Sequence, residues 1–191
     1  IYHYVKIENI SAAIGVVERA RHSLMNAERW ERLGYMISML PSKDLDTPAI
    51  LAVKAFHAEN RFMIGKSLEY IERLEKSCHT GEKKVAMDSC VKAELDALRA
   101  MKYYFRTDTE KSIQFGARAL ENLPPECASV RGFAHGLSAF SLQMQGDAAK
   151  ALQQLSQALE GCDPSYPTLK GRLLLIFCFM YWFEGDLQNL T

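Results

Sequence analysis

The sequence predicts an all-α fold built from successive helical hairpins, and three observations carry this prediction. Apolar residues recur three and four positions apart along most of the chain, which is the spacing of one face of a helix. No segment alternates apolar and polar residues in the way that a half-buried strand does. With 11 Gly and 6 Pro among 191 residues, the chain has few of the residues that a turn-dense β fold needs.

The first helices are placed by their apolar stripes and end signals. Residues 11–20 form one predicted helix, and a second runs from Arg29 to Leu40. The stripe of the second helix consists of Trp30, Leu33, Met36, Ile37 and Leu40. Pro41 ends this helix, because the residue before a proline is driven out of the α region. Thr47 then caps a new helix that begins at Pro48.

A turn recurs at a fixed interval in the second half of the chain. Asp108, Asp147 and Asp186 are spaced 39 residues apart, and each turn lies between a long apolar helix and a shorter amphipathic one. We expect Gly146 and Gly185 to close the preceding helices in the left-handed conformation. We expect each Asp to cap the helix that follows it.

One of these three turns and a weaker, earlier copy depart from this pattern. The turn at Asp108 has no Gly, so a capping box formed by Thr107 and Glu110 is expected to start its helix. A weaker copy of the turn lies at Asn60–Phe62. The interval from this copy to the next turn is longer, so extra residues are expected around positions 79–83.

These signals predict a single helical repeat domain over residues 1–191. Its hairpins are expected at roughly 11–40, 47–78, 85–122, 127–161 and 167–191. The last hairpin stops six residues into its second helix, so we expect the chain to be a fragment of a larger protein. The run from Leu173 to Phe183 is apolar all round and should be covered on both sides, and the truncated edge beside it is expected to self-associate.

Composition and charge exclude several classes of partner. Lys and Arg number 23, as do Asp and Glu, which leaves no electrostatic case for binding nucleic acid or an anionic membrane. The longest apolar run has eleven residues, about half of what a membrane-spanning helix needs. The chain shows no targeting segment, and its five Cys form no CxxC pair. We therefore expect a cytoplasmic protein with reduced, structural thiols.

The later turns and helices resemble tetratricopeptide-like repeats. Ala151 is the small residue four positions after the turn Asp, and Ala158-Leu159-Glu160 and Pro164 follow at the expected places. The resemblance implies a right-handed superhelix of helical hairpins. The 39-residue interval exceeds the standard repeat of 34 residues.

More specifically, the chain resembles the helical sensor region of LuxR-type, ATP-dependent transcriptional regulators related to the maltose activator MalT. The motifs that carry this resemblance are Glu28-Arg29-Trp30 with Leu33, Met39-Leu40-Pro41, Asn60-Arg61-Phe62 and the run from Glu94 to Ala100. Glu28 and Asn60 stand where the family usually has Gly. The resemblance implies a module that senses an inducer or a protein or peptide partner and relays this state to ATPase and DNA-binding modules. ATP and magnesium would belong to the upstream module, because this chain has no phosphate-binding loop, and it has no basic recognition helix to contact DNA.

Aligning the helices with tetratricopeptide-like hairpins predicts a concave groove, rich in aromatic residues, for an inducer or partner. Its predicted residues are Ile50, Lys54, His57, Met101, Tyr104, Phe105, Phe133, Phe140, Gln143, Met144, Arg172, Phe179, Trp182 and Phe183. The alternative is that these aromatic residues only pack between repeats. A generic scaffold that holds protein partners together is the alternative function.

Neither a metal site nor a catalytic site is expected. Cys78-His79 with Cys90 fits no standard zinc spacing. The five Cys and five His converge on no nucleophilic motif, and His135 is expected to be a core or groove residue. The sequence therefore indicates a binding module that needs no cofactor of its own and has no enzymatic activity.

Overall fold

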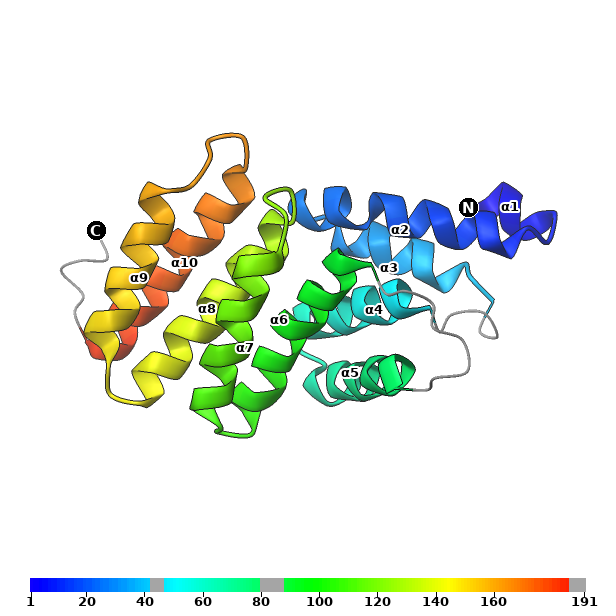
Figure 1. Ribbon diagram of the computed structural model, residues 1–191. Coiled ribbons are helices and arrows are strands. Elements are labelled where there is room, and N and C mark those ends of the chain that lie inside the picture. The colour runs from blue at the N-terminus through cyan, green and yellow to red at the C-terminus, as the bar shows by residue number, and fades with distance from the viewer. Residues whose placement is uncertain (42–46, 80–87, 186–191) are drawn as a thin grey trace. The chain divides into compact units, whose positions relative to one another are not determined.

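A computed structural model describes residues 1–41, 47–79 and 88–185, and in these ranges the chain is helical and contains no strand (Figure 1). This confirms the predicted all-α class. The helices are α1 (Tyr2–Lys6), α2 (Ile10–Asn26), α3 (Trp30–Ser38), α4 (Pro48–Asn60), α5 (Ile64–His79), α6 (Ser89–Phe105), α7 (Thr109–Asn122), α8 (Ala128–Met144), α9 (Ala148–Glu160) and α10 (Pro167–Glu184).

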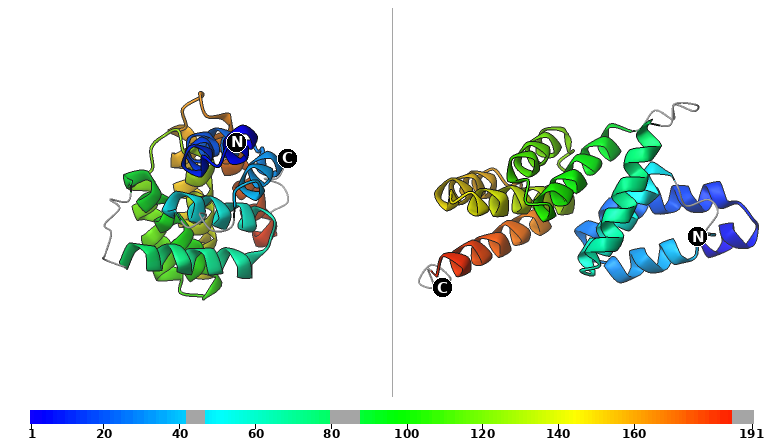
Figure 2. Two further views of the ribbon diagram at one scale, coloured as in Figure 1. Left: turned by 90° about the vertical axis from the view of Figure 1, so that its right-hand side faces the viewer. Right: turned by 90° about the horizontal axis from the view of Figure 1, so that it is seen from below.

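The helices form two compact units, Ile1–Leu98 and Arg99–Thr191, and the boundary between the units falls within α6. In the N-terminal unit α2 packs on α3 and α4, and α4 packs on α5. In the C-terminal unit α8 packs on α7, α9 and α10, and α9 also contacts α10. Figure 2 shows the helices of each unit from two further directions.

A left-handed residue follows each of the helices α1, α2, α4, α6, α8 and α10. These residues are Glu8, Glu28, Phe62, Thr107, Gly146 and Gly185, with φ between 53° and 82°. The two Gly confirm the prediction from the sequence. Glu28 also adopts this conformation, but in the next turn the left-handed residue is Phe62 rather than Asn60, which is the last helical residue of α4. The turn therefore lies within Asn60–Phe62, where the sequence predicts it.

Side-chain caps begin the helices where the sequence placed them. Thr47 accepts a hydrogen bond from the backbone N–H of Ile50, with Pro48 in the first turn of α4. Asp108 and Asp147 each accept one from the N–H three residues later, at 3.2 Å. The third turn Asp, Asp186, lies outside the described residues, as do positions 80–83 of the expected insertion.

The predicted capping box in the turn before α7 was wrong. The hydroxyl of Thr107 donates to the carbonyl oxygen of Arg106 instead of accepting from the helix. Thr107 adopts the left-handed conformation that turns the chain, so the N-cap of α7 is Asp108, one position later.

A small buried residue lies five positions after the left-handed residue in three of these turns. Ser67, Ser112 and Ala151 are all fully buried in the second helix of their hairpins. Twelve positions before each is an Ala of the preceding helix: Ala55, Ala100 and Ala139. The hydroxyls of Ser67 and Ser112 donate to the carbonyl oxygens of Ala55 and Ala100, both at 2.9 Å. Small residues thus let the two helices of each hairpin approach closely, and the Ser hydroxyls are satisfied by the partner backbone.

In the C-terminal unit α8 and α10 run parallel with close contact. A Cβ on Gly132 would lie 2.8 Å from Cδ of Arg172, and one on Gly136 would lie 3.2 Å from Cδ1 of Ile176. The residues of both pairs, Gly132 with Arg172 and Gly136 with Ile176, are 40 positions apart. The two helices therefore keep the same register along this contact. This register brings the carboxyl-terminal halves of α8 and α10 side by side.

The apolar run of α10 is covered on one side among the described residues. Leu173, Ile176 and Met180 are buried against α8 and α9, whereas Leu174 and Leu175 are exposed. Cover of the exposed side stays a prediction, because it is expected from a helix after Asp186 or from a second copy of the chain.

Candidate ligand-binding face

Six aromatic side chains of the C-terminal unit form a continuous surface, called the aromatic face below. It consists of Tyr104 and Phe105 from the end of α6, Phe140 from α8, and Phe179, Trp182 and Phe183 from α10. The ring centroids of Tyr104 and Phe140 are 6.4 Å apart, and those of Phe140 and Phe179 are also 6.4 Å apart. Phe140 therefore connects the rings of α6 with those of α10.

The α10 part of the aromatic face follows from helical spacing. Phe179, Trp182 and Phe183 lie at positions i, i+3 and i+4, which share one side of a helix. The rings of Trp182 and Phe183 are almost parallel, at 6° and 6.0 Å, and Phe183 meets Phe140 edge-on at 79°. Such stacked and edge-to-face pairs are the favoured aromatic geometries.

The aromatic face is open to solvent at its α10 end. Trp182 and Phe183 are 61% and 62% exposed, and Phe105 on α6 and Met144 on α8 are also exposed. Apolar side chains that gather on a surface in this way are typical of binding sites, whereas single exposed apolar residues need no explanation.

Polar groups lie at one end of the aromatic face. The side-chain amide of Gln143 on α8 donates to the carboxylate of Glu184 on α10, at 3.3 Å. Both side chains are solvent-facing enough to exchange this bond for one to a ligand. The site can therefore offer hydrogen bonds next to a stacking surface.

The structure brings together Tyr104, Phe140, Gln143, Phe179 and Trp182 of the residues predicted for a groove. Met101 is buried and does not line the aromatic face. The prediction assumed that the side of α6 that carries Met101 faces a ligand, but that side packs in the core. Phe133 lies half-buried in the first half of α8, and Arg172 packs its aliphatic stem against Gly132.

Lys54 and His57 belong to the N-terminal unit and have local roles there. The ammonium of Lys54 lies 5.5 Å from the ring centre of Tyr70 on α5. His57 packs against Gly34 of α3, where an added Cβ would collide with its ring. Burial, and then the charge of Arg61, lower the pKa of His57. Both side chains therefore help α4 to pack on its neighbours.

A hollow of about 400 Å³ lies between α7, α8 and α9. Its walls include Ile113, Leu120, Leu155, Gln154 and His135. Burial, with a smaller effect of the Arg131 charge, lowers the pKa of His135 to about 4, so the ring is neutral at neutral pH. The expectation of a core or groove position for His135 is confirmed.

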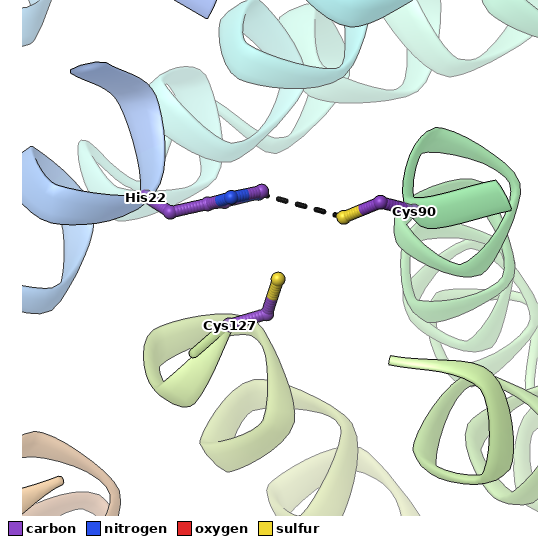
Figure 3. Close-up of side chains that lie close together, drawn as sticks. All are labelled: His22, Cys90 and Cys127. Carbon is purple, nitrogen blue, oxygen red and sulfur yellow. Dashed lines mark hydrogen bonds between the residues drawn. The ribbon is translucent and has the colours of Figure 1, made fainter. Parts of the chain in front are cut away.

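The N-terminal unit contains a buried polar cluster that the sequence did not predict. Nε2 of His22 on α2 lies 3.8 Å from Sγ of Cys90 on α6, and the two side chains point toward one another (Figure 3). Arg21 and Glu94 complete this cluster. The sequence contains no motif that joins Cys and His residues, and it did not predict this pair. The 68 residues that separate His22 and Cys90 follow no motif, so only the packing of α2 on α6 reveals the pair.

Comparison with protein-family models, curated proteins and solved structures finds no match to this chain. Within the described residues, no helix has both the length and the apolar character that crossing a bilayer requires.

Proposed function

We propose that this chain is a signal-sensing module that binds an inducer or a protein partner on the aromatic face. The observation that carries this proposal is that three helices of successive hairpins contribute rings to one exposed surface. A ligand stacked on that surface would contact all three helices at once. Modules of this kind bind and relay, and need neither a catalytic residue nor a cofactor of their own.

The architecture we infer for the whole chain is a right-handed superhelix of tetratricopeptide-like hairpins. Three features support it: the recurring left-handed turn, the small residues at the hairpin crossings, and the parallel register of α8 and α10. In such a superhelix the first helices of successive hairpins line one side. On this proposal, Phe140 of α8 and Phe179 of α10 lie on that side.

The parent protein we propose is a cytoplasmic, LuxR-type transcriptional regulator similar to MalT. The motifs around Trp30, Pro41 and Phe62 support this proposal. Binding would favour one arrangement of the hairpins over another, because a ligand shifts an equilibrium only by its difference in affinity for the two states. ATPase and DNA-binding modules elsewhere in the parent would respond to that shift.

A generic adapter for protein partners is the second candidate, and the openness of the aromatic face favours it. Trp182 and Phe183 lie on an exposed surface rather than in an enclosed pocket, which suits an extended peptide better than a small molecule. The two functions differ in what the parent protein contains, not in which residues bind.

Sequencing the coding DNA on both sides of this chain distinguishes the two candidates. The regulator predicts a phosphate-binding loop upstream and a helix-turn-helix downstream. A reading frame with neither would contradict the regulator and leave the adapter.

Mutation of the aromatic face tests whether it binds at all. Combined Tyr104→Ala, Phe140→Ala and Trp182→Ala should abolish binding of a ligand identified by screening. Tyr35→Ala, which removes an exposed ring from the N-terminal unit, is the matched control and should leave binding unchanged. Unchanged binding in the triple variant would contradict this assignment.

A further inference from the structure

The buried polar cluster of the N-terminal unit joins two helices through one carboxylate. Glu94 of α6 is 1% exposed. Its Oε1 accepts from Nε of Arg21 at 3.2 Å and lies 2.5 Å from Nε2 of His22, and its Oε2 accepts from Nη2 of Arg21 at 3.5 Å. A charge this deeply buried is tolerated only when it is paired, so Arg21 and His22 are held firmly in place.

Cys90 lies one helical turn before Glu94 and faces the same two cationic side chains. Its Sγ is 3.8 Å from Nε2 of His22 and 4.0 Å from Nη2 of Arg21. The thiol is partly accessible rather than buried. A thiol that lies close to two cationic side chains and is partly accessible to solvent has the surroundings of a reactive cysteine.

His22 carries a positive charge at neutral pH. Burial alone would lower its pKa, but the hydrogen bonds to Cys90 and Glu94 and the charge of Glu94 outweigh burial and the Arg21 charge. Together they raise the pKa to about 9. Glu94 opposes ionisation of Cys90 as a like charge on the same side of α6, yet its two oxygens already accept from Arg21 and His22. The two cations therefore dominate the field at the sulfur.

We propose that Cys90 is a reactive thiolate, stabilised by His22 and Arg21, and that hydrogen peroxide oxidises it to a sulfenic acid. The sulfur attacks one peroxide oxygen, so that an S–O bond forms while the O–O bond breaks. The departing hydroxide takes the proton of the His22 imidazolium and leaves as water. The sulfur loses two electrons to the peroxide, and the product is a sulfenic acid beside a neutral His22. The N-terminal unit would thereby respond to oxidants independently of the aromatic face.

Alkylation rates in the wild-type chain test the thiolate directly. Iodoacetamide at pH 7, with each Cys followed by peptide mass spectrometry, should modify Cys90 at least roughly tenfold faster than Cys178, although Cys178 is the more exposed. After treatment with hydrogen peroxide, dimedone should label Cys90 before Cys178. A Cys90 rate equal to or below that of Cys178 would overturn the thiolate, and preferential labelling of Cys178 by dimedone would overturn the oxidation site.

Two variants test the role of the imidazolium. His22→Gln should slow alkylation of Cys90 roughly tenfold and leave Cys178 unchanged. His57→Gln is the matched control, because it removes a half-buried His of the same unit that packs on Gly34 instead of on Cys90. Circular dichroism confirms that each variant is folded. If His22→Gln leaves the Cys90 rate unchanged, the proposed activation is wrong. If His22→Gln unfolds the chain, the comparison of Cys90 with Cys178 in the wild type still tests whether Cys90 is a reactive thiolate.

Discussion

Gly132 lies where α8 and α10 approach closely, so its lack of a side chain matters. An added Cβ would lie 2.9 Å from Cβ of Arg172, which cannot move without its backbone. Gly171 is a helical Gly of α10 with open space around it. Comparing the two separates the effect of packing from that of helix propensity.

Gly132→Ala should destabilise the C-terminal unit by about 1–3 kcal/mol, because the two helices must separate. Gly171→Ala should stabilise it by up to about 1 kcal/mol, because Ala is the better helix former. Chemical denaturation followed by circular dichroism measures both. Equal effects of the two substitutions would show that α8 and α10 are not in close contact at Gly132.

The half-buried, neutral His135 predicts a pH dependence of stability. Its folded pKa of about 4 lies below the usual 6.5, so at pH values between these two the unfolded state takes up a proton that the folded state does not. Stability is therefore full above about pH 6.5 and falls as the pH drops toward 4. The loss should amount to about 2–3 kcal/mol.

The variant His135→Gln isolates this effect, because Gln does not titrate. The free energy of unfolding of the wild type should fall relative to that of the variant between pH 7 and pH 4. Parallel stability curves for the two proteins would contradict the lowered pKa of His135 in the folded chain.

At the scale of single residues, the sequence predicted most of the aromatic face but not the buried polar cluster of the N-terminal unit. Tyr104, Phe140 and Phe179 were found because the repeat register places equivalent positions on one side. Met101 was wrongly assigned to the groove, because an error of one position in the helix alignment exchanges a surface residue for a core residue. His22 and Cys90 are distant in sequence, and the pair depends on tertiary packing.

At the scale of elements, non-Gly residues occupy left-handed positions in several turns. Thr107 has φ 58° where the next repeat has Gly146 with φ 82°. A β-branched residue is disfavoured in this conformation, because its Cβ crowds the backbone. The surrounding hairpin therefore imposes the turn on an unsuitable residue.

Thr107→Gly should stabilise the chain by about 0.5–1 kcal/mol, since relief of the left-handed strain exceeds the entropy that Gly adds to the unfolded state. Gly146→Ala is the reverse test and should destabilise by about 1 kcal/mol, with no clash because nothing lies within 4 Å of the added Cβ. Thermal unfolding of both variants checks this pair. A loss of stability in Thr107→Gly would show that the Thr side chain contributes more than its backbone strain costs.

Helix limits were more predictable than turn details. Thr47, Asp108 and Asp147 cap the starts of α4, α7 and α9 as their side chains indicate, and Gly146 and Gly185 follow the ends of α8 and α10. The sequence located the turn at Asn60–Phe62 but not its left-handed residue, because an exposed Phe carries no signal for that conformation. Its position is decided by the crossing of Ala55 and Ser67 in the hairpin.

For the whole molecule, the exposed side of α10 predicts self-association between copies of the chain. Leu174 and Leu175 are exposed on a helix whose other side forms the core. Leu175→Glu should raise the dissociation constant of the dimer roughly tenfold, or about 1.4 kcal/mol. Sedimentation equilibrium measures this, with Tyr35→Glu as a control at an exposed site of the N-terminal unit. A wild-type chain that stays monomeric at high concentration would contradict the prediction.

Trp182 offers the most direct test of the aromatic face. The chain has two Trp, and the other, Trp30, is buried in the N-terminal unit with its indole N–H bonded to Glu28. In a Trp30→Phe variant, all Trp emission therefore reports on the aromatic face. A ligand found by thermal-shift screening should change Trp182 emission saturably, with the same midpoint as its calorimetric binding curve, and Phe140→Ala should abolish the change. A ligand that stabilises the chain while leaving Trp182 emission unchanged would contradict the aromatic face as the binding site.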